Sequence, residues 1–313
     1  MDSQENNIEA MSLSRRTFTA GLAVAMTAPL VAQAQTPLIK RPIPQGSGET
    51  MPVVGLGTAV VFNAAANSPQ RAGAVSVVRA LVDGGGTLID TAPSYGAAEG
   101  FVGEILTETA LRSRVFISTK LEEYRPGGEE AEAQACLQRL KTDKVDLLQL
   151  HNTKKADQDM GGINALKAKG LCRYTGISTT FERDYAATEA IVRRARPDFL
   201  EIDYALDNRK AEERLLPTAR DSGTAVLVAL PFGRGRLFRA ALGKPLPDWA
   251  AEFDCASWGQ FFLKFILGHP AVTAAIPGTG KPEHMIDNLG AARGRLPDEK
   301  MRARMIQYVE QLG

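Results

Sequence analysis

Three features of the chain predict an α/β fold in which eight parallel strands form a single (β/α)8 TIM barrel. Eight short apolar runs alternate with segments of helical spacing, an order that is typical of parallel strands joined by crossover helices. Polar residues stand at the ends of several runs, as they do where a barrel collects side chains at one mouth. The chain has 313 residues, which fits a barrel of about 250 residues with insertions.

The expected elements begin with residues 36–52, which form either a hairpin or a floor under the barrel. The eight strands are expected at 53–58, 87–91, 115–120, 145–151, 173–178, 199–206, 225–231 and 272–278. The first helix is indicated by Ala74, Val77, Val78 and Leu81, whose spacing places them on one face. No low-complexity linker interrupts the alternation, so residues 35–313 are predicted to be one domain.

A doubly wound sheet is the rival architecture, and it would need a glycine-rich phosphate turn directly after an early strand. Residues 54–58 read VGLGT, which resembles such a turn. The run lacks the third glycine, the start of a helix at the turn and an acidic residue at the expected later strand end. The barrel is therefore the predicted fold.

Composition and charge argue against several classes of protein. The chain is 44% hydrophobic and 23% charged with a formal net charge of +1, so it lacks the basic excess of a nucleic-acid surface. The three cysteines are Cys136, Cys172 and Cys255. They are scattered and form no CxxC pair, so buried thiols are expected rather than disulfides or a zinc site.

A metal-dependent barrel hydrolase is a further alternative, and it would need several histidines and acids at the strand ends. The chain has only three histidines, His151, His269 and His284. His269 precedes the eighth strand and is expected at the opposite mouth of the barrel. No metal is therefore expected.

Four polar residues carry the candidate chemistry: Asp90, Tyr95, Lys120 and His151. A phenol loses its proton near pH ~10, so a tyrosine that acts as an acid or base needs a neighbouring cation to favour the phenolate. Lys120 can supply that cation, and Asp90 can keep the buried lysine ionised. His151 can then hold a carbonyl oxygen where negative charge develops. We expect one active site.

The motifs DTAPSYG (90–96), FISTK (116–120) and LLQLH (147–151), in this order, resemble those of the aldo-keto reductases. The resemblance covers nearly the whole chain after residue 34. It implies a nicotinamide-dependent oxidoreductase that reduces a small aldehyde, ketone or sugar, or oxidises the alcohol. Carried over by motif, Tyr95 is the proton donor, Lys120 and Asp90 tune it, and His151 orients the carbonyl. The alternative is a non-catalytic barrel that binds NADP(H) as a redox-sensing or regulatory subunit.

The resemblance also implies NADP(H) as the cofactor, with NAD(H) as the alternative. Residues 276–288 run from a strand into a helix, with Pro282 suited to its first turn. A helix N-terminus with free amides and a nearby lysine can bind a phosphate. The implied contacts are Gly57, Thr58, Ser178, Thr179, Glu201, Pro231, Phe232, Gly233, Arg234, Gly278, Thr279, Lys281, His284, Asp287 and Asn288.

Several positions depart from the family's pattern. Glu201 stands where glutamine is frequent, and Ala229 where an aromatic residue is frequent. Gly278 and His284 stand where many members have lysine and arginine, which leaves Lys281 as the remaining cation. The preference for NADP(H) over NAD(H) is therefore expected to be narrower than in relatives with a stronger basic cluster.

The first residues are predicted to be a signal segment outside the fold. Residues 14–18 read SRRTF, and they precede an apolar stretch too short to span a bilayer and a small-residue pattern at 32–34. This resembles a twin-arginine export signal over residues 1–34. The export machinery is then a partner, the periplasm is the expected location, and no stable membrane insertion follows processing. Met11 is an alternative start to Met1.

Replacing both arginines, Arg15→Lys with Arg16→Lys, tests the export signal. The change keeps the positive charge but removes the pair that the machinery reads. We expect folded protein to remain in the cytoplasm, as measured by cell fractionation and immunoblotting of the parent and the double variant. Unchanged delivery of the variant to the periplasm would contradict the assignment.

Overall fold

The computed structural model describes residues 36–63, 68, 70–122 and 128–312. The expected signal segment, residues 1–34, lies outside the described residues, so its assignment stays a prediction. Within the described ranges, no helix is both long and apolar enough to cross a membrane.

Eight parallel strands form one sheet that closes on itself. They are β3 (Leu56–Gly57), β4 (Leu88–Asp90), β5 (Phe116–Leu121), β6 (Val145–Leu150), β7 (Cys172–Thr179), β8 (Phe199–Asp203), β9 (Ala225–Ala229) and β10 (Ala274–Ala275). Neighbours in the sheet follow the chain order from β3 to β10, and every pair is parallel. Parallel bridges join Val54 to Ala275 and Gly57 to Gly278, so the two outer strands meet. The predicted barrel is confirmed, and the doubly wound sheet is excluded.

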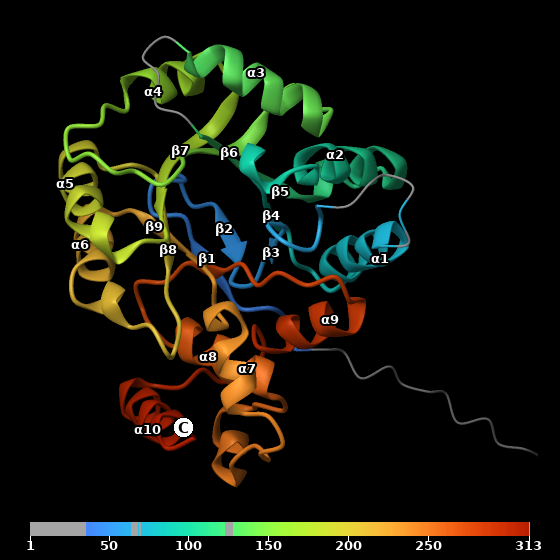
Figure 1. Ribbon diagram of the computed structural model, residues 1–313, viewed down its shortest axis with the longest axis vertical. Coiled ribbons are helices and arrows are strands. Elements are labelled where there is room, and N and C mark those ends of the chain that lie inside the picture. The colour runs from blue at the N-terminus through green and yellow to red at the C-terminus, as the bar shows by residue number, and fades with distance from the viewer. Residues whose placement is uncertain (1–35, 64–67, 69, 123–127, 313) are drawn as a thin grey trace, which may run out of the picture. The chain divides into compact units, whose positions relative to one another are not determined.

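Helices surround the strands, as Figure 1 shows. Their bounds are α1 (Gln70–Asp83), α2 (Ala98–Thr109), α3 (Glu129–Leu140), α4 (Gly161–Ala168), α5 (Tyr185–Ala195), α6 (Leu215–Ser222), α7 (Arg236–Ala240), α8 (Trp258–Leu267), α9 (Pro282–Gly290) and α10 (Glu299–Glu310). The four residues expected on the inner face of the first helix are all buried on α1. Pro282 opens α9, as its fixed φ and missing amide proton favour.

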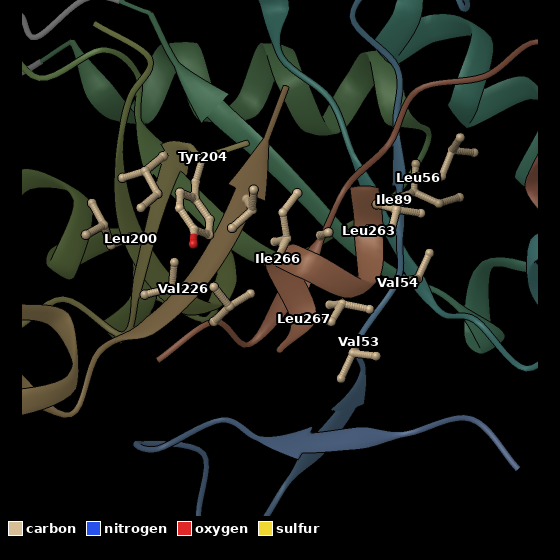
Figure 2. Packing of buried hydrophobic residues seen from close by; sticks show 14 of the residues in the cluster. Val53, Val54, Leu56, Ile89, Leu200, Tyr204, Val226, Leu263, Ile266 and Leu267 are labelled. Atoms are coloured by element: carbon tan, nitrogen blue, oxygen red, sulfur yellow. The ribbon is translucent and has the colours of Figure 1, made fainter. Parts of the chain in front are cut away.

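The larger part of the core lies between the sheet and the helices. Figure 2 shows Leu200 and Val226 from β8 and β9 in the same cluster as Leu263, Ile266 and Leu267 from α8. These side chains are completely buried. Hydrophobic burial of this kind fixes each helix against its strands. The three cysteines are free and buried, as predicted.

A second apolar cluster fills the barrel interior near the start of the strands. Phe116 and Phe199 come from β5 and β8, which are not neighbours in the sheet, yet their ring centroids are 6.0 Å apart. Ile43 and Met51 belong to this cluster. They are contributed by the antiparallel hairpin of β1 (Lys40–Pro42) and β2 (Thr50–Pro52) and its turn. The leading stretch is therefore a hairpin that closes the lower end of the barrel.

Closure of the barrel depends on glycine in the first strand. A Cβ atom at Gly57 would lie 2.7 Å from the carbonyl oxygen of Ile276, nearer than real Cβ atoms approach. Without a side chain there, the amide of Gly57 donates to the carbonyl of Pro277 over 3.1 Å. The end of β3 and the segment after β10 consequently reach the same mouth of the barrel.

Candidate active site

The four candidate catalytic residues lie together at the carboxyl ends of the strands. Asp90 ends β4, Lys120 lies near the end of β5, and His151 follows β6. Tyr95 lies in a short 3-10 turn, η1 (Pro93–Tyr95), directly after β4. Asp90, Tyr95 and His151 line a cavity of about 400 Å³, and Lys120 is completely buried behind it. The Tyr95 and His151 rings meet edge to face, with centroids 6.1 Å apart.

Lys120 is held by two carboxylates and one carbonyl. Its Nζ donates to Asp90 Oδ2 over 2.6 Å and to the Thr91 carbonyl over 3.1 Å. Glu201 Oε2, from β8, lies 3.2 Å from the same Nζ. The ammonium group is 5.3 Å from the centroid of the Tyr95 ring. Glu201, expected as a cofactor contact, is thus also a second counter-ion of Lys120.

Hydrogen bonds from neighbouring strands orient both carboxylates. Ser118 Oγ, on β5, donates to Asp90 Oδ1 over 2.8 Å. Gln149, on β6, links Glu201 to Ser118. Its Nε2 donates to Glu201 Oε2 over 2.7 Å and to Ser118 Oγ over 3.1 Å. All of these side chains are buried, so the network excludes water from Lys120.

The charge balance of this cluster is one cation against two carboxylates. Burial and the charge of Glu201 raise the pKa of Asp90 to about 7, although Lys120 opposes them. Burial alone would lower the pKa of Lys120, but Asp90 and Glu201 outweigh it and raise that pKa well above its ordinary value. Lys120 therefore stays an ammonium ion at neutral pH, and it is Asp90 that takes up a proton as the pH falls.

Tyr95 keeps its proton at neutral pH. Burial raises the pKa of its phenol above the ordinary value, Lys120 lowers it, and Asp90 and Glu201 raise it again. Lys120 acts in the predicted direction, but the expected net lowering is not found because burial and the two carboxylates outweigh a single cation. The phenol is therefore in the form of a proton donor.

Glu122, which sequence reasoning missed, holds the histidine of the site. Its Oε2 lies 2.7 Å from His151 Nδ1, and its Oε1 accepts a hydrogen bond of 3.0 Å from the Ser94 amide. Burial alone would raise the pKa of Glu122, but the hydrogen bonds from His151 and Ser94 lower it to about 2. The one signal in the sequence is the spacing, since Glu122 follows Lys120 by two residues and continues the same side of β5.

Seven of the residues expected to contact a cofactor line the cavity: Gly57, Thr58, Glu201, Pro231, Phe232, Arg234 and Gly278. Asn152 and Thr180 line it as well and were missed. Ser178 and Thr179 are buried, and their hydroxyl groups form hydrogen bonds with backbone amides of this chain. Ser178 Oγ accepts from the Asn152 amide over 3.1 Å, and Thr179 Oγ1 accepts from the Phe181 amide over 3.3 Å.

The remaining expected contacts lie in and just before α9 and in the turn after β9. Lys281 and His284 are exposed, whereas Asn288 is buried. The Asp287 carboxylate accepts from Ser257 Oγ over 2.6 Å and from Gln260 Nε2 over 2.8 Å, which ties α9 to α8. Thr279 Oγ1 accepts from the Lys281 amide, and Gly233 has the left-handed backbone of a tight turn. In the part of the chain that the structure describes, no group of three or more histidines, cysteines or acids could hold a metal ion.

Comparison with known proteins agrees with this architecture. The model of the aldo/keto reductase family matches residues 53–305. Methylglyoxal reductase YeaE of Escherichia coli is 31% identical over 255 residues, covering 78% of this chain and 87% of the relative. Aldo-keto reductase str7 of Strobilurus tenacellus is 26% identical over 293 residues, covering 81% and 85%.

Solved structures agree with the fold as well. The crystal structure of an aldo-keto reductase from Klebsiella pneumoniae in complex with NADPH matches with a TM-score of 0.71 at 26% identity. The match covers 87% of this chain and 96% of the other. With a closed barrel, a Tyr–Lys–Asp–His group at its mouth and a family match over most of its length, the chain belongs to the aldo/keto reductase family.

Proposed function

We propose that the protein reduces a small aldehyde or ketone with NADPH, and that Tyr95 donates the proton. The observation that carries the proposal is that Tyr95 and His151 share one cavity and that the buried Lys120 ammonium lies 5.3 Å from the centroid of the Tyr95 ring. The similarity to a methylglyoxal reductase supports a small carbonyl substrate. The NADPH in the Klebsiella pneumoniae structure supports the cofactor.

The cavity has the chemistry that a nicotinamide cofactor needs. Asn152 Oδ1 is buried in its wall and has no hydrogen-bond partner among the described residues, so it can accept from an amide such as a carboxamide. Arg234 lines the cavity, and Lys281 precedes α9. Lys281 is exposed. Burial raises the pKa of the Asp203 carboxyl, and the charge of Arg234 opposes this rise. Both Lys281 and Arg234 are cations that can bind phosphate.

The residues of the site supply the proton and stabilise the charge. The bound cofactor would supply the hydride to the carbonyl carbon. Tyr95 gives its proton to the carbonyl oxygen, and the positive charge of Lys120 stabilises the phenolate that remains. Asp90 keeps Lys120 charged and in place. Because the pKa of Tyr95 lies above its ordinary value, the site starts in the protonated form that reduction requires.

Removal of the phenol hydroxyl by Tyr95→Phe tests the proton donor. General acid catalysis contributes about 10²- to 10⁴-fold, so kcat for methylglyoxal reduction should fall at least that far, while NADPH affinity changes little. Steady-state kinetics and NADPH fluorescence titration give the two values. Tyr308→Phe, a matched change on the outer helix α10, should leave both unchanged.

Activity of Tyr95→Phe within a few-fold of the parent would remove Tyr95 from the mechanism. A parent that binds NADPH but turns over no aldehyde, sugar or ketone would instead favour the non-catalytic barrel. The two results can be told apart, because the Tyr95→Phe comparison requires a parent protein that is active.

Removal of the cation before α9 tests the proposed phosphate contact. We expect Lys281→Ala to lower kcat/KM for NADPH several-fold and to leave that for NADH nearly unchanged, because only NADPH carries the extra phosphate. Lys300→Ala, an exposed lysine of α10, is the control. An NADH preference in the parent would overturn the cofactor assignment.

A further inference from the structure

We propose that Glu122 is a positioning residue that allows His151 to donate a hydrogen bond to the substrate only in its doubly protonated form. The inference rests on the proposed carbonyl reduction and concerns the group that holds the carbonyl oxygen. It makes a histidinium ion, rather than a neutral imidazole, the partner of Tyr95.

Both oxygens of Glu122 are committed to the site. Oε2 lies 2.7 Å from His151 Nδ1, and Oε1 accepts from the Ser94 amide over 3.0 Å. Ser94 directly precedes Tyr95 in η1, so Glu122 links the turn that carries the proton donor to the histidine. The Glu122 and His151 side chains are only 25% and 10% exposed, which limits competition from water.

The contact with Glu122 determines which ring nitrogen of His151 carries the proton. An ionised carboxylate can only accept hydrogen bonds, so Nδ1 of His151 must carry the proton that lies between them. The low pKa of Glu122, about 2, keeps its carboxylate ionised throughout the working range. A neutral imidazole has a single N–H, and Glu122 occupies it. In the neutral ring, Nε2 is then an acceptor and cannot donate to a carbonyl oxygen.

Nε2 is the nitrogen left for the substrate. The described residues provide it with no hydrogen bond, and the ring lines the cavity beside Tyr95. A second hollow, of about 290 Å³, lies on the Glu122 side of the ring. Of the described residues, the titratable and charged groups that line the two hollows beside the ring are Tyr95 on η1, Asp90 on β4, Glu122 after β5, Lys154 and Lys155 after β6, Glu201 on β8 and Arg234 after β9, and the Lys120 ammonium lies close to the Tyr95 ring. Among these described groups, Glu122 is the one that forms a hydrogen bond with the ring.

Reduction should therefore depend on the second proton of His151. When the ring gives up its second proton, His151 loses its donor at Nε2. Tyr95 is still protonated at that point because its pKa is raised. We therefore expect His151, rather than Tyr95, to be the group whose proton loss ends reduction at alkaline pH.

The variant Glu122→Gln should exchange donor and acceptor at His151 Nδ1, and glutamine has nearly the same shape as glutamate. The Ser94 amide requires an acceptor, which places the glutamine oxygen on that side and its NH₂ group towards Nδ1. Nδ1 then becomes an acceptor, and the neutral ring carries its proton on Nε2, where it can donate to the substrate. A structural role alone would not produce this exchange of tautomers.

The kinetic test is the pH profile of kcat/KM for methylglyoxal with NADPH. In the parent we expect kcat/KM to decline by about tenfold per pH unit on the alkaline side, as for loss of one essential proton. In Glu122→Gln this decline should be absent, with a change below about threefold over the same range. Glu130→Gln, an exposed acid of α3, should retain the parent profile. Identical profiles in the parent and Glu122→Gln would overturn the proposal.

Nitrogen NMR of the histidines tests the tautomers without reference to activity. The chain has three histidines, and His151→Gln assigns the signal of interest. In its neutral form, His151 should be protonated at Nδ1 in the parent and at Nε2 in Glu122→Gln. A neutral His151 protonated at Nε2 in the parent would refute the proposal, even if the variant did not fold. If the tautomers are as expected but no carbonyl is reduced, the proposed function fails while the Glu122–His151 pair stands.

Discussion

The site depends on a lysine ammonium ion buried inside the barrel. Lys120 is completely buried, and a charge in that position is costly unless partners replace the lost hydration. Asp90 at 2.6 Å and Glu201 at 3.2 Å do so; Asp90 comes from β4, next to β5, and Glu201 from β8, which β6 and β7 separate from β5. Loss of one partner from such a group leaves an uncompensated charge, which costs about 3–5 kcal/mol in other proteins. The buried charge of Lys120 is therefore stable only while β4 and β8 hold their carboxylates in these positions.

The same arrangement explains why a second carboxylate is compatible with the site. Two acids and one base give an excess of negative charge, and this excess raises the pKa of Asp90 to about 7 after burial has already raised it. It also works against ionisation of Tyr95. A site with this balance favours the phenol over the phenolate, which suits donation of a proton in reduction. Glu122 adds a separate negative charge on the other side of the cavity, next to His151.

Much of the fold and part of the site could be predicted from the sequence. Apolar residues dominate the eight strands because most strand positions are buried, so the number and order of the strands were readable. Asp90, Tyr95, Lys120 and His151 lie at the ends of such runs, and parallel order alone brings them to one mouth. Their distances from one another follow from the closure of the sheet, which the sequence signals only through glycines such as Gly57.

What could not be predicted is the set of contacts between distant segments. The sequence gives no indication that Glu201 reaches Lys120, or that Gln149 spans Ser118 and Glu201, because these contacts need the angle between strands. The direction of the Tyr95 pKa shift could not be predicted for the same reason. Burial and the charges of Asp90 and Glu201 raise this pKa, whereas the charge of Lys120 lowers it. Glu122 was missed because an acid after a strand is usually solvated.

The most direct test of this account is the titration of the Asp90 carboxyl group, followed by carbon NMR in the parent and in Glu201→Gln. Glu201 disfavours ionisation of Asp90, so its replacement by the neutral isostere should lower the pKa of Asp90 from about 7. Glu213→Gln, an exposed acid, should leave it unchanged. If the parent's Asp90 is fully ionised at pH ~5, or if Glu201→Gln does not move its titration, the two carboxylates do not share Lys120 as described.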